Sequence, residues 1–378
     1  MKKALLFLII FSILFTTGCW DMVEINERIY PYAVGIDVNN AESSEGDSYM
    51  VTFSYPNIFS MGENATQEET IYAVLSTGSS LFDAAQNLTS NLQYPIYNKH
   101  LKVLVLSDAV ARNPKNVLGI IDGLNRDYVI NKMIQLVVTP KTAEELIFGK
   151  LKAKRQRTTE GVLYSILINR QNTSMFTPKT LANFIDDMDR TGVSTLPMAS
   201  MVEDYVDIAG AGIFKNYQLI GYIDAKENEG IAMLNNRIRA TGIDATYNGT
   251  DLSILATNIK TKKKLIDAEN LKVEFLVKIE GQVHEFTLPQ GNYTGIDTEE
   301  MLHDMEEAVE NEVKMNIVNT LEILQKEYQA DAIYLSDYLE KYHPNVWKQV
   351  KDNWDEVFLE AELEVDVEVV IERRGLTK

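Results

Sequence analysis

The chain begins with a short apolar run that differs from everything after it. The twelve residues Ala4–Phe15 are apolar except for Ser12, and Lys2 and Lys3 precede them. As a helix the run would span roughly 18 Å, at about 1.5 Å per residue, whereas the hydrocarbon core of a bilayer measures roughly 30 Å. Positive charges before a short apolar segment are typical of a secretory signal. We therefore predict a signal peptide over residues 1–18.

The remainder of the first half alternates between the apolar periods of strands and helices. Helices are expected after Ser80, Asn113 and Thr142, each of which stands where a helix N-cap is favoured. Strand-like runs precede the first helix start, at Ile29–Val38 and Tyr49–Tyr55, and lie between the later ones, at Leu101–Leu106 and Met133–Thr139. This alternation predicts an α+β or α/β arrangement.

The second half favours antiparallel strands and one long helix. The pattern predicts a hairpin over 209–224 with its turn at Asn216-Tyr217, and two strands over 252–258 and 271–283 joined by a basic turn at Lys260–Lys264. Apolar residues three or four apart predict a helix from about 298 to 328, started by a capping box of Asp297 and Glu300. A last strand, 360–372, alternates apolar residues with carboxylates.

These elements together predict an α+β, multi-domain protein with two to three domains, built from mostly antiparallel or mixed sheets with packed helices. We expect an N-terminal α+β region over 19–195, which a break near residue 150 would divide into two subdomains. The small residues and the proline around 196–206 predict a linker. The C-terminal α+β domain, 207–378, is expected to have about five strands and one long helix.

Composition limits the functions that this chain can have. The sequence is 45% hydrophobic and 24% charged, which is enough apolar residue to bury sizeable cores, and its formal charge is −19. Residues 297–378 hold 22 Asp and Glu against 8 Lys and Arg, a net charge of −14. This excess argues against nucleic-acid binding, which needs a basic surface. It also predicts that the C-terminal part stands away from an anionic membrane.

The only cysteine, Cys19, directly follows the predicted signal peptide and the small residues Thr17 and Gly18. This is the position at which a bacterial lipoprotein signal places a thiol that receives a diacylglyceryl group. We therefore predict lipidation of Cys19 and a membrane anchor through that lipid. The alternatives are an uncleaved membrane helix, and a buried free cysteine behind an ordinary signal peptide. No disulfide is expected, because one cysteine cannot form one.

Motifs of catalysis and metal binding are missing from the sequence. The four histidines, 100, 284, 303 and 343, stand singly, without a second ligand at metal-binding spacing. There is no Gly-x-Ser-x-Gly elbow, phosphate loop or dinucleotide fingerprint. We expect no enzyme activity, cofactor or metal, and a solvated face for the carboxylates of the last strand, beside Lys272 and Lys278. The basic segment Lys150–Arg157 is either a contact for lipid headgroups or an acidic partner, or a solvated helix face.

Ten short motifs follow one another along nearly the whole chain: Cys19-Trp20-Asp21, Glu24-Ile25, Val34-Gly35-Ile36-Asp37, His100-Leu101-Lys102-Val103, Leu124-Asn125-Arg126-Asp127, Thr142-Ala143-Glu144-Glu145-Leu146, Ala211-Gly212-Ile213-Phe214-Lys215, Leu219-Ile220-Gly221, Tyr342-His343-Pro344-Asn345-Val346-Trp347-Lys348 and Asn353-Trp354-Asp355-Glu356. In this order they resemble the Ger(x)C lipoproteins, which are the C subunits of spore germinant receptors. Between residues 333 and 336 the chain reads Ile-Tyr-Leu-Ser, where many members have a Phe-Gly-Phe-Gly-like sequence.

The resemblance implies a non-catalytic receptor subunit on the extracytoplasmic face of the spore inner membrane. It implies partnership with two multi-spanning subunits, of A and B type, in a complex that responds to nutrients. Nutrient specificity in this family is attributed to the membrane subunits, so direct small-molecule binding by this chain is not expected. The alternative is a solute-binding lipoprotein of an envelope transporter, which would have two doubly wound α/β lobes and a hinge.

Overall fold

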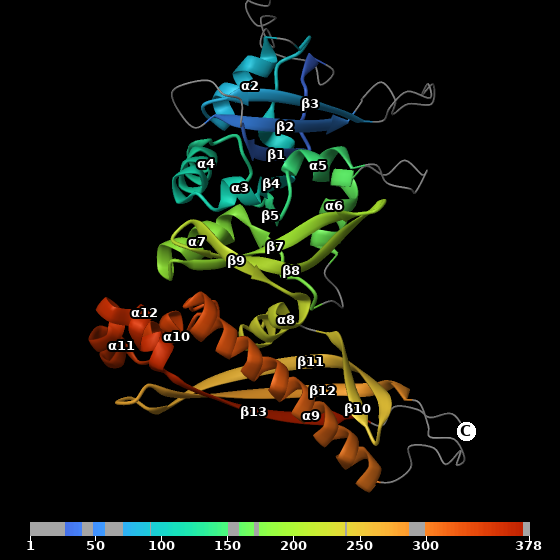
Figure 1. Cartoon of the computed structure of the whole chain (residues 1–378), viewed down its shortest axis with the longest axis vertical. Helices are drawn as coiled ribbons and strands as arrows, with labels where there is room; N and C mark the ends of the chain where they lie inside the picture. The colour runs from blue at the N-terminus through green and yellow to red at the C-terminus, as the bar shows by residue number, and fades with distance from the viewer. Residues whose placement is uncertain are drawn as a thin grey trace, which may run out of the picture.

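The computed structural model describes residues 27–39, 48–56, 71–90, 92–149, 159–169, 174–238, 240–286 and 299–372. Their strands form two β-sheets that lie toward opposite ends of the long axis of the molecule, with helix α8 (Ala225–Leu234) between them (Figure 1). The predicted lipidation site Cys19 and the basic segment Lys150–Arg157 lie outside the described residues.

The first sheet has nine strands and mixed pairing. Its order is β3-β2-β1-β4-β5-β7-β8-β9, and β6 pairs with β5. β1, β4 and β5 are parallel neighbours, whereas β1–β3 and β7–β9 are joined by antiparallel pairs. The strands are β1 (Ala33–Val38), β2 (Tyr49–Pro56), β3 (Ile71–Gly78), β4 (Val103–Ser107), β5 (Gln135–Thr139), β6 (Lys179–Thr180), β7 (Val193–Val202), β8 (Tyr205–Lys215) and β9 (Gln218–Ile223).

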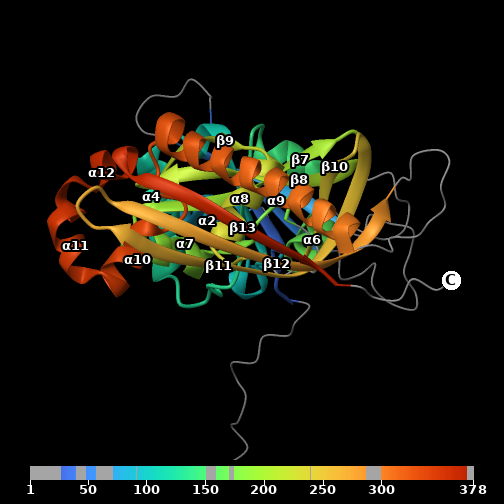
Figure 2. The ribbon, with the colours of Figure 1, turned by 90° about the horizontal axis from the view of Figure 1, so that it is seen from below.

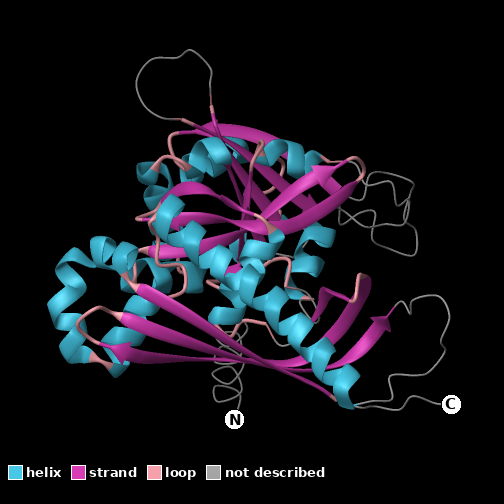
Figure 3. Ribbon diagram, turned by 60° about the horizontal axis from the view of Figure 1, so that its bottom comes forward, coloured by secondary structure: helices cyan, strands magenta, loops and turns pink. Residues whose placement is uncertain are grey.

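Helices cover both faces of this sheet (Figure 3). Leu104 and Leu106 of β4 face α2 (Leu81–Thr89), α4 (Pro114–Arg126) and α7 (Leu181–Arg190). Val103 and Val105 point the other way, toward α5 (Ala143–Phe148) and α6 (Thr159–Ile168). A strand covered on both faces has no solvated side, so all of β4 is buried, as its continuous apolar run favours. A 3₁₀ turn (Asn98–His100) and the short α3 (Asp108–Ala111) flank β4.

The three predicted helix starts are confirmed by their caps. The side chain of Ser80 accepts a hydrogen bond from the amide of Asp83 at 3.0 Å, and Asn113 caps α4 in the same way. The hydroxyl of Thr142 accepts from the amide of Glu145 at 3.1 Å. For α9, the predicted capping residue Asp297 lies outside the described residues.

Two of the sequence motifs that carry the family resemblance, Val34–Asp37 and Thr142–Leu146, lie together at the start of α5. The carboxylate of Asp37, only 3% exposed, accepts hydrogen bonds from the amides of Ala143 at 2.8 Å and Glu144 at 3.0 Å. A negative charge is stabilised there by the free amides of a helix N-terminus. Gly35 lets the two elements approach, because a Cβ on it would lie 2.7 Å from Cδ1 of Ile147.

The predicted linker at 196–206 is wrong. These residues form the end of β7, its turn and the start of β8, and Leu196 and Ala199 are fully buried in the first sheet. Small residues suit a strand packed on both faces, and Pro197 is tolerated because it adjoins a break in register with β8.

The hairpin predicted over 209–224 is confirmed. Asn216 and Tyr217 form its turn with φ values of 51° and 65°, and its strands β8 and β9 extend the first sheet.

The second sheet has the strand order β10-β11-β12-β13. Its members are β10 (Thr241–Tyr247), β11 (Thr250–Asp267), β12 (Lys272–Phe286) and β13 (Glu362–Ile371). β13 is parallel to β12, and the other pairs are antiparallel. The predicted basic turn at Lys260–Lys264 is wrong, since these residues lie inside β11, where alternate side chains are buried. The chain turns after Asp267 instead.

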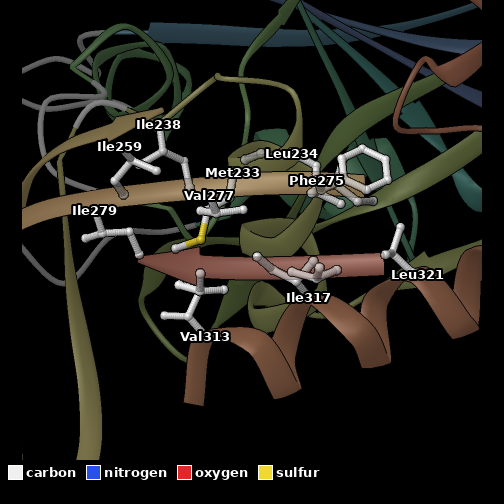
Figure 4. Close-up of a cluster of buried hydrophobic side chains, with 14 of the residues drawn as sticks. Met233, Leu234, Ile238, Ile259, Phe275, Val277, Ile279, Val313, Ile317 and Leu321 are labelled. Atoms are coloured by element: carbon white, nitrogen blue, oxygen red, sulfur yellow. The ribbon is translucent and has the colours of Figure 1, made fainter. Parts of the chain in front are cut away.

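One long helix, α9 (Glu299–Glu322), crosses the second sheet and continues as a π-helical turn, Ile323–Tyr328 (Figure 2). Figure 4 shows Val313, Ile317 and Leu321 of α9 in the same cluster as Phe275 and Val277 of β12. The predicted apolar stripe of this helix is therefore confirmed as core. On the opposite face of the sheet, Lys272 pairs with Glu364 at 2.7 Å and Lys278 with Glu368 at 3.0 Å, which confirms a solvated ladder.

Carboxylates of α9 accept hydrogen bonds from backbone amides on the outer edge of β13. The amides of Val369 and Ile371 donate to Oε1 of Glu310 at 2.9 Å and of Glu306 at 2.8 Å. Unpaired strand edges invite association, so these bonds shield the edge.

Three short helices and a 3₁₀ turn form one end of this half: α10 (Leu335–Tyr342), α11 (Pro344–Val350), Lys351–Asn353 and α12 (Trp354–Glu360). Within the described ranges, no helix is both long and apolar enough to cross a bilayer.

Candidate functional site: the junction between the two sheets

Polar side chains gather where the segment 328–337, between α9 and α10, meets α7 and the β8–β9 hairpin. The chain can turn sharply there because Gln329 and Tyr334 adopt left-handed backbone conformations, with φ of 49° and 53°. That conformation favours glycine, and Tyr334 stands in the stretch where many Ger(x)C proteins have a glycine-containing sequence. We call this region the junction.

A buried charged network centres on one carboxylate oxygen, Oδ2 of Asp187 on α7. It accepts from Nζ of Lys179 at 2.5 Å, from Oγ of Ser194 at 2.6 Å and from the hydroxyl of Tyr334 at 2.8 Å. Lys179 is 4% exposed and Asp187 is 2% exposed. Burial lowers the pKa of Lys179 and raises the pKa of Tyr334 well above its usual value. The network therefore ties the segment before α10 to the first sheet.

A second buried carboxylate, Asp331, shapes the segment itself. Its two oxygens accept from the amides of Leu335 at 2.8 Å and Ser336 at 2.7 Å, so it caps the start of α10. Burial raises the pKa of Asp331, and those amides oppose the rise. From the neighbouring sheet, Nζ of Lys263 donates to the carbonyl of Ile333. The cation of β11 thus holds the same turn from the other side.

Further bonds join the two halves around this network. Lys215 of β8 donates to the carbonyl of Gln329 at 2.7 Å, and Arg190 of α7 pairs with Asp337 of α10 at 2.7 Å. The hydroxyl of Tyr328 donates to the carbonyl of Tyr222 at 2.6 Å. Gly221 permits this approach, since a Cβ there would lie 2.2 Å from the ring of Tyr328.

The buried charged groups of the junction are hydrogen-bonded to residues of the other elements that meet there, so the arrangement suits a fixed relation between the two sheets. The histidines that the sequence analysis singled out are not brought together: His100 contacts Tyr30, and His343 bonds to Tyr338. The part of the chain that the structure describes holds no group of three or more His, Cys, Asp or Glu side chains placed to bind a metal ion.

Sequence reasoning did not find the junction. The hydrogen-bonded pairs of its buried network are 7 to 155 positions apart along the chain, so no local motif joins them. One signal was present in the stretch 333–336, which departs from the family pattern at the residue whose hydroxyl reaches Asp187.

Two protein-family models match the chain in tandem. The spore germination protein N-terminal domain matches residues 21–201, and the model described as spore germination B3/GerAC like, C-terminal, matches residues 209–375. The crystal structure of the GerBC protein shares this fold, with a TM-score of 0.60 and 20% sequence identity, over 93% of this chain and 100% of that one.

Curated relatives match over almost their whole length. Spore germination protein B3 of Bacillus subtilis (strain 168) is 26% identical over 377 residues, which cover 97% of each chain. Spore germination protein A3 of the same organism is 25% identical over 388 residues, 99% of this chain and 98% of that one. The α+β fold predicted from the sequence is thus confirmed, and the chain belongs to the GerAC-like family of spore germination proteins, the C-subunit family of germinant receptors.

Proposed function

We propose that this chain is a lipid-anchored, non-catalytic subunit of a nutrient germinant receptor, needed for assembly and function of that receptor in spore germination. The observation that carries the proposal is the match of both family models, in order, with relatives named as spore germination proteins that align from end to end. The partners are two multi-spanning subunits, of A and B type, and the location is the extracytoplasmic face of the spore inner membrane.

The anchor is the diacylglyceryl group on Cys19. Two acyl chains hold a protein stably at a bilayer, whereas one holds it only marginally. Cys19 precedes Glu27, the first described residue, by eight positions, which reach at most about 28 Å when extended. The entry into β1 then lies close to the membrane, and tethering raises the effective concentration of the folded part for its integral partners.

Charge favours one orientation of the anchored protein. The strands β1–β3 lie at one end of the long axis and the second sheet lies at the other (Figure 1). At the entry into β1, Arg28 lies 4.6 Å from the ring centroid of Tyr97. Lys102, whose amide donates to the carbonyl of Tyr32 there, has its Nζ 5.8 Å from the ring centroid of Tyr164. The far end contains most of the strongly acidic stretch 297–378. An anionic membrane repels that end, so the end with strands β1–β3 faces the membrane.

The junction supports a scaffold role. A buried network that fixes the two sheets lets surfaces on both halves be presented together to the membrane subunits. Rigid presentation lowers the conformational entropy that binding costs. The proposal therefore assigns the receptor contacts to exposed surfaces of the two halves, and the buried junction to their alignment.

Affinity purification from spore inner membranes tests the proposal. A tagged chain should isolate with two multi-spanning proteins. The Cys19→Ala variant should lose most of this association and slow germination, because the tether is gone. Thr17→Ala keeps both the thiol and a small residue beside Gly18, and serves as the matched control. Isolation of the chain without such partners, or full assembly and germination of the Cys19→Ala variant, would contradict the proposal.

A further inference from the structure

A basic pocket opens beside the junction, between the end of α8, strand β11 and helix α10. Its volume is about 700 Å³, which is in the range of small-molecule sites. Among the described residues, five cationic residues line it and one acidic residue, Asp337; of the adjacent lysines 262 and 263 in β11, Lys263 is on the junction side, because neighbouring side chains of a strand point to opposite faces. The cations are Arg190, Arg237, Lys262, Lys263 and Lys341. In a chain of net charge −19, such a gathering of positive charge has to be explained.

Most of these cations lack a carboxylate partner. Arg190 pairs with Asp337 at 2.7 Å and with Asp186 at 3.2 Å. Within the described ranges, Arg237, Lys262 and Lys341 form no ion pair, and each is exposed. The positive charges of Arg237, Lys263 and Lys341 repel one another across the pocket, so the arrangement costs stability unless an anion occupies it.

The innermost cation is held by neutral oxygens. Nζ of Lys263 donates to the carbonyls of Ile333 and Tyr334. Burial lowers its pKa to about 8, so it is mostly charged at neutral pH. Arg237 lies close enough to the buried network that its charge adds to the effect of burial in lowering the pKa of Lys179. The positive charge of the pocket therefore also acts on the buried network of the junction.

We propose that this pocket binds a small, multiply charged anion bearing phosphate or carboxylate groups. The guanidinium groups of Arg190 and Arg237 and the ammonium groups of Lys263 and Lys341 come from α7, the segment after α8, β11 and α10. Such groups match this ligand, and charge-assisted hydrogen bonds would hold it. The walls come from both halves of the molecule, Arg190 from α7 and the other four cations from the second half. The site is independent of the lipid anchor, and it departs from our sequence-based expectation that the chain binds no small molecule directly.

Isothermal titration of the full chain in mild detergent tests the site. Pyrophosphate and citrate are the two probes, and acetate is the singly charged control. One equivalent of pyrophosphate or of citrate should bind, acetate should not, and affinity should fall as salt rises from 20 to 200 mM, since salt shortens the range of charge interactions. Binding of pyrophosphate alone assigns a phosphate ligand, and binding of citrate alone assigns a polycarboxylate. Binding of neither overturns the proposal.

A pair of double variants locates the binding. Arg237→Gln with Lys341→Gln removes two exposed cations that form no ion pair among the described residues, and it should weaken the affinity at least about tenfold. Lys115→Gln with Lys314→Gln makes the same change of net charge at exposed residues that do not line the pocket, and should retain the affinity. Equal affinity in the two double variants, with unchanged circular dichroism, would overturn the proposal.

Discussion

Replacing Asp187 by alanine should destabilise the protein more than any surface change. Lys179 would stay buried without its carboxylate, and Ser194 and Tyr334 would lose their acceptor. Removal of one partner from a buried ion pair typically costs 3–5 kcal/mol, so we expect a loss of about 4 kcal/mol in the free energy of unfolding. Urea titration measures this loss through the fluorescence of Trp347 and Trp354, whose rings meet edge to face near the junction with centroids 5.3 Å apart.

Two further variants decide whether the buried charge is the cause. The double variant Lys179→Met with Asp187→Leu removes both charges and should recover at least about 2 kcal/mol relative to the alanine variant. Asp122→Ala breaks an exposed pair with Arg126 and should cost less than about 1 kcal/mol. If Asp187→Ala costs no more than Asp122→Ala, or if the double variant is as unstable as the alanine variant, the reasoning is refuted.

Three other predictions test separate parts of the fold. Burial lowers the pKa of Lys263 from 10.5 to about 8, so between these pH values the unfolded chain binds more protons than the native one. The free energy of unfolding should therefore rise by about 2 kcal/mol from pH 7.5 to 9.5. Urea titrations at the two pH values measure this rise, and Lys263→Met should remove it. Replacing Glu306 and Glu310 by alanine frees two edge amides of β13. It should lower the free energy of unfolding by about 2–3 kcal/mol and cause concentration-dependent association, measured by light scattering. A monodisperse variant of unchanged stability would contradict this. Gly230→Ala should lower the free energy of unfolding by about 1–3 kcal/mol, since its Cβ would lie 2.4 Å from a side-chain oxygen of α9. Gly123→Ala has open space around its Cβ and should raise the free energy of unfolding by up to about 1 kcal/mol. Thermal melts that rank the two glycine variants in the opposite order would contradict the packing.

The elements that sequence reasoning placed well have strong local signals. Caps at Ser80, Asn113 and Thr142 are where the helices begin. The alternation of β12 and β13 correctly assigned one face to the core and the other to solvent. The stripe of α9 was recognised because residues three or four apart share a helix face.

The errors arose where tertiary packing overrides local composition. Small residues and Pro197 suggested a linker, but they belong to a strand buried in the first sheet. The lysines 260–264 suggested a turn, but a long strand alternates them between solvent and the junction side. Strand β3 and helix α8 were not assigned at all.

The junction and the basic pocket could not be predicted, because their residues come together only in the folded chain. Arg190, Lys263 and Asp337 are each unremarkable in the sequence. Their meaning depends on the turn at Tyr334, whose left-handed backbone no sequence rule favours for tyrosine. The predicted lipidation of Cys19, by contrast, rests on the sequence pattern alone and stays a prediction.

Mass spectrometry of the amino-terminal peptide, isolated from the native membrane, tests the central claim most directly. The account predicts a chain that starts at Cys19 and carries a diacylglyceryl group on its sulfur. A chain that starts elsewhere, or a free thiol on Cys19, would contradict it.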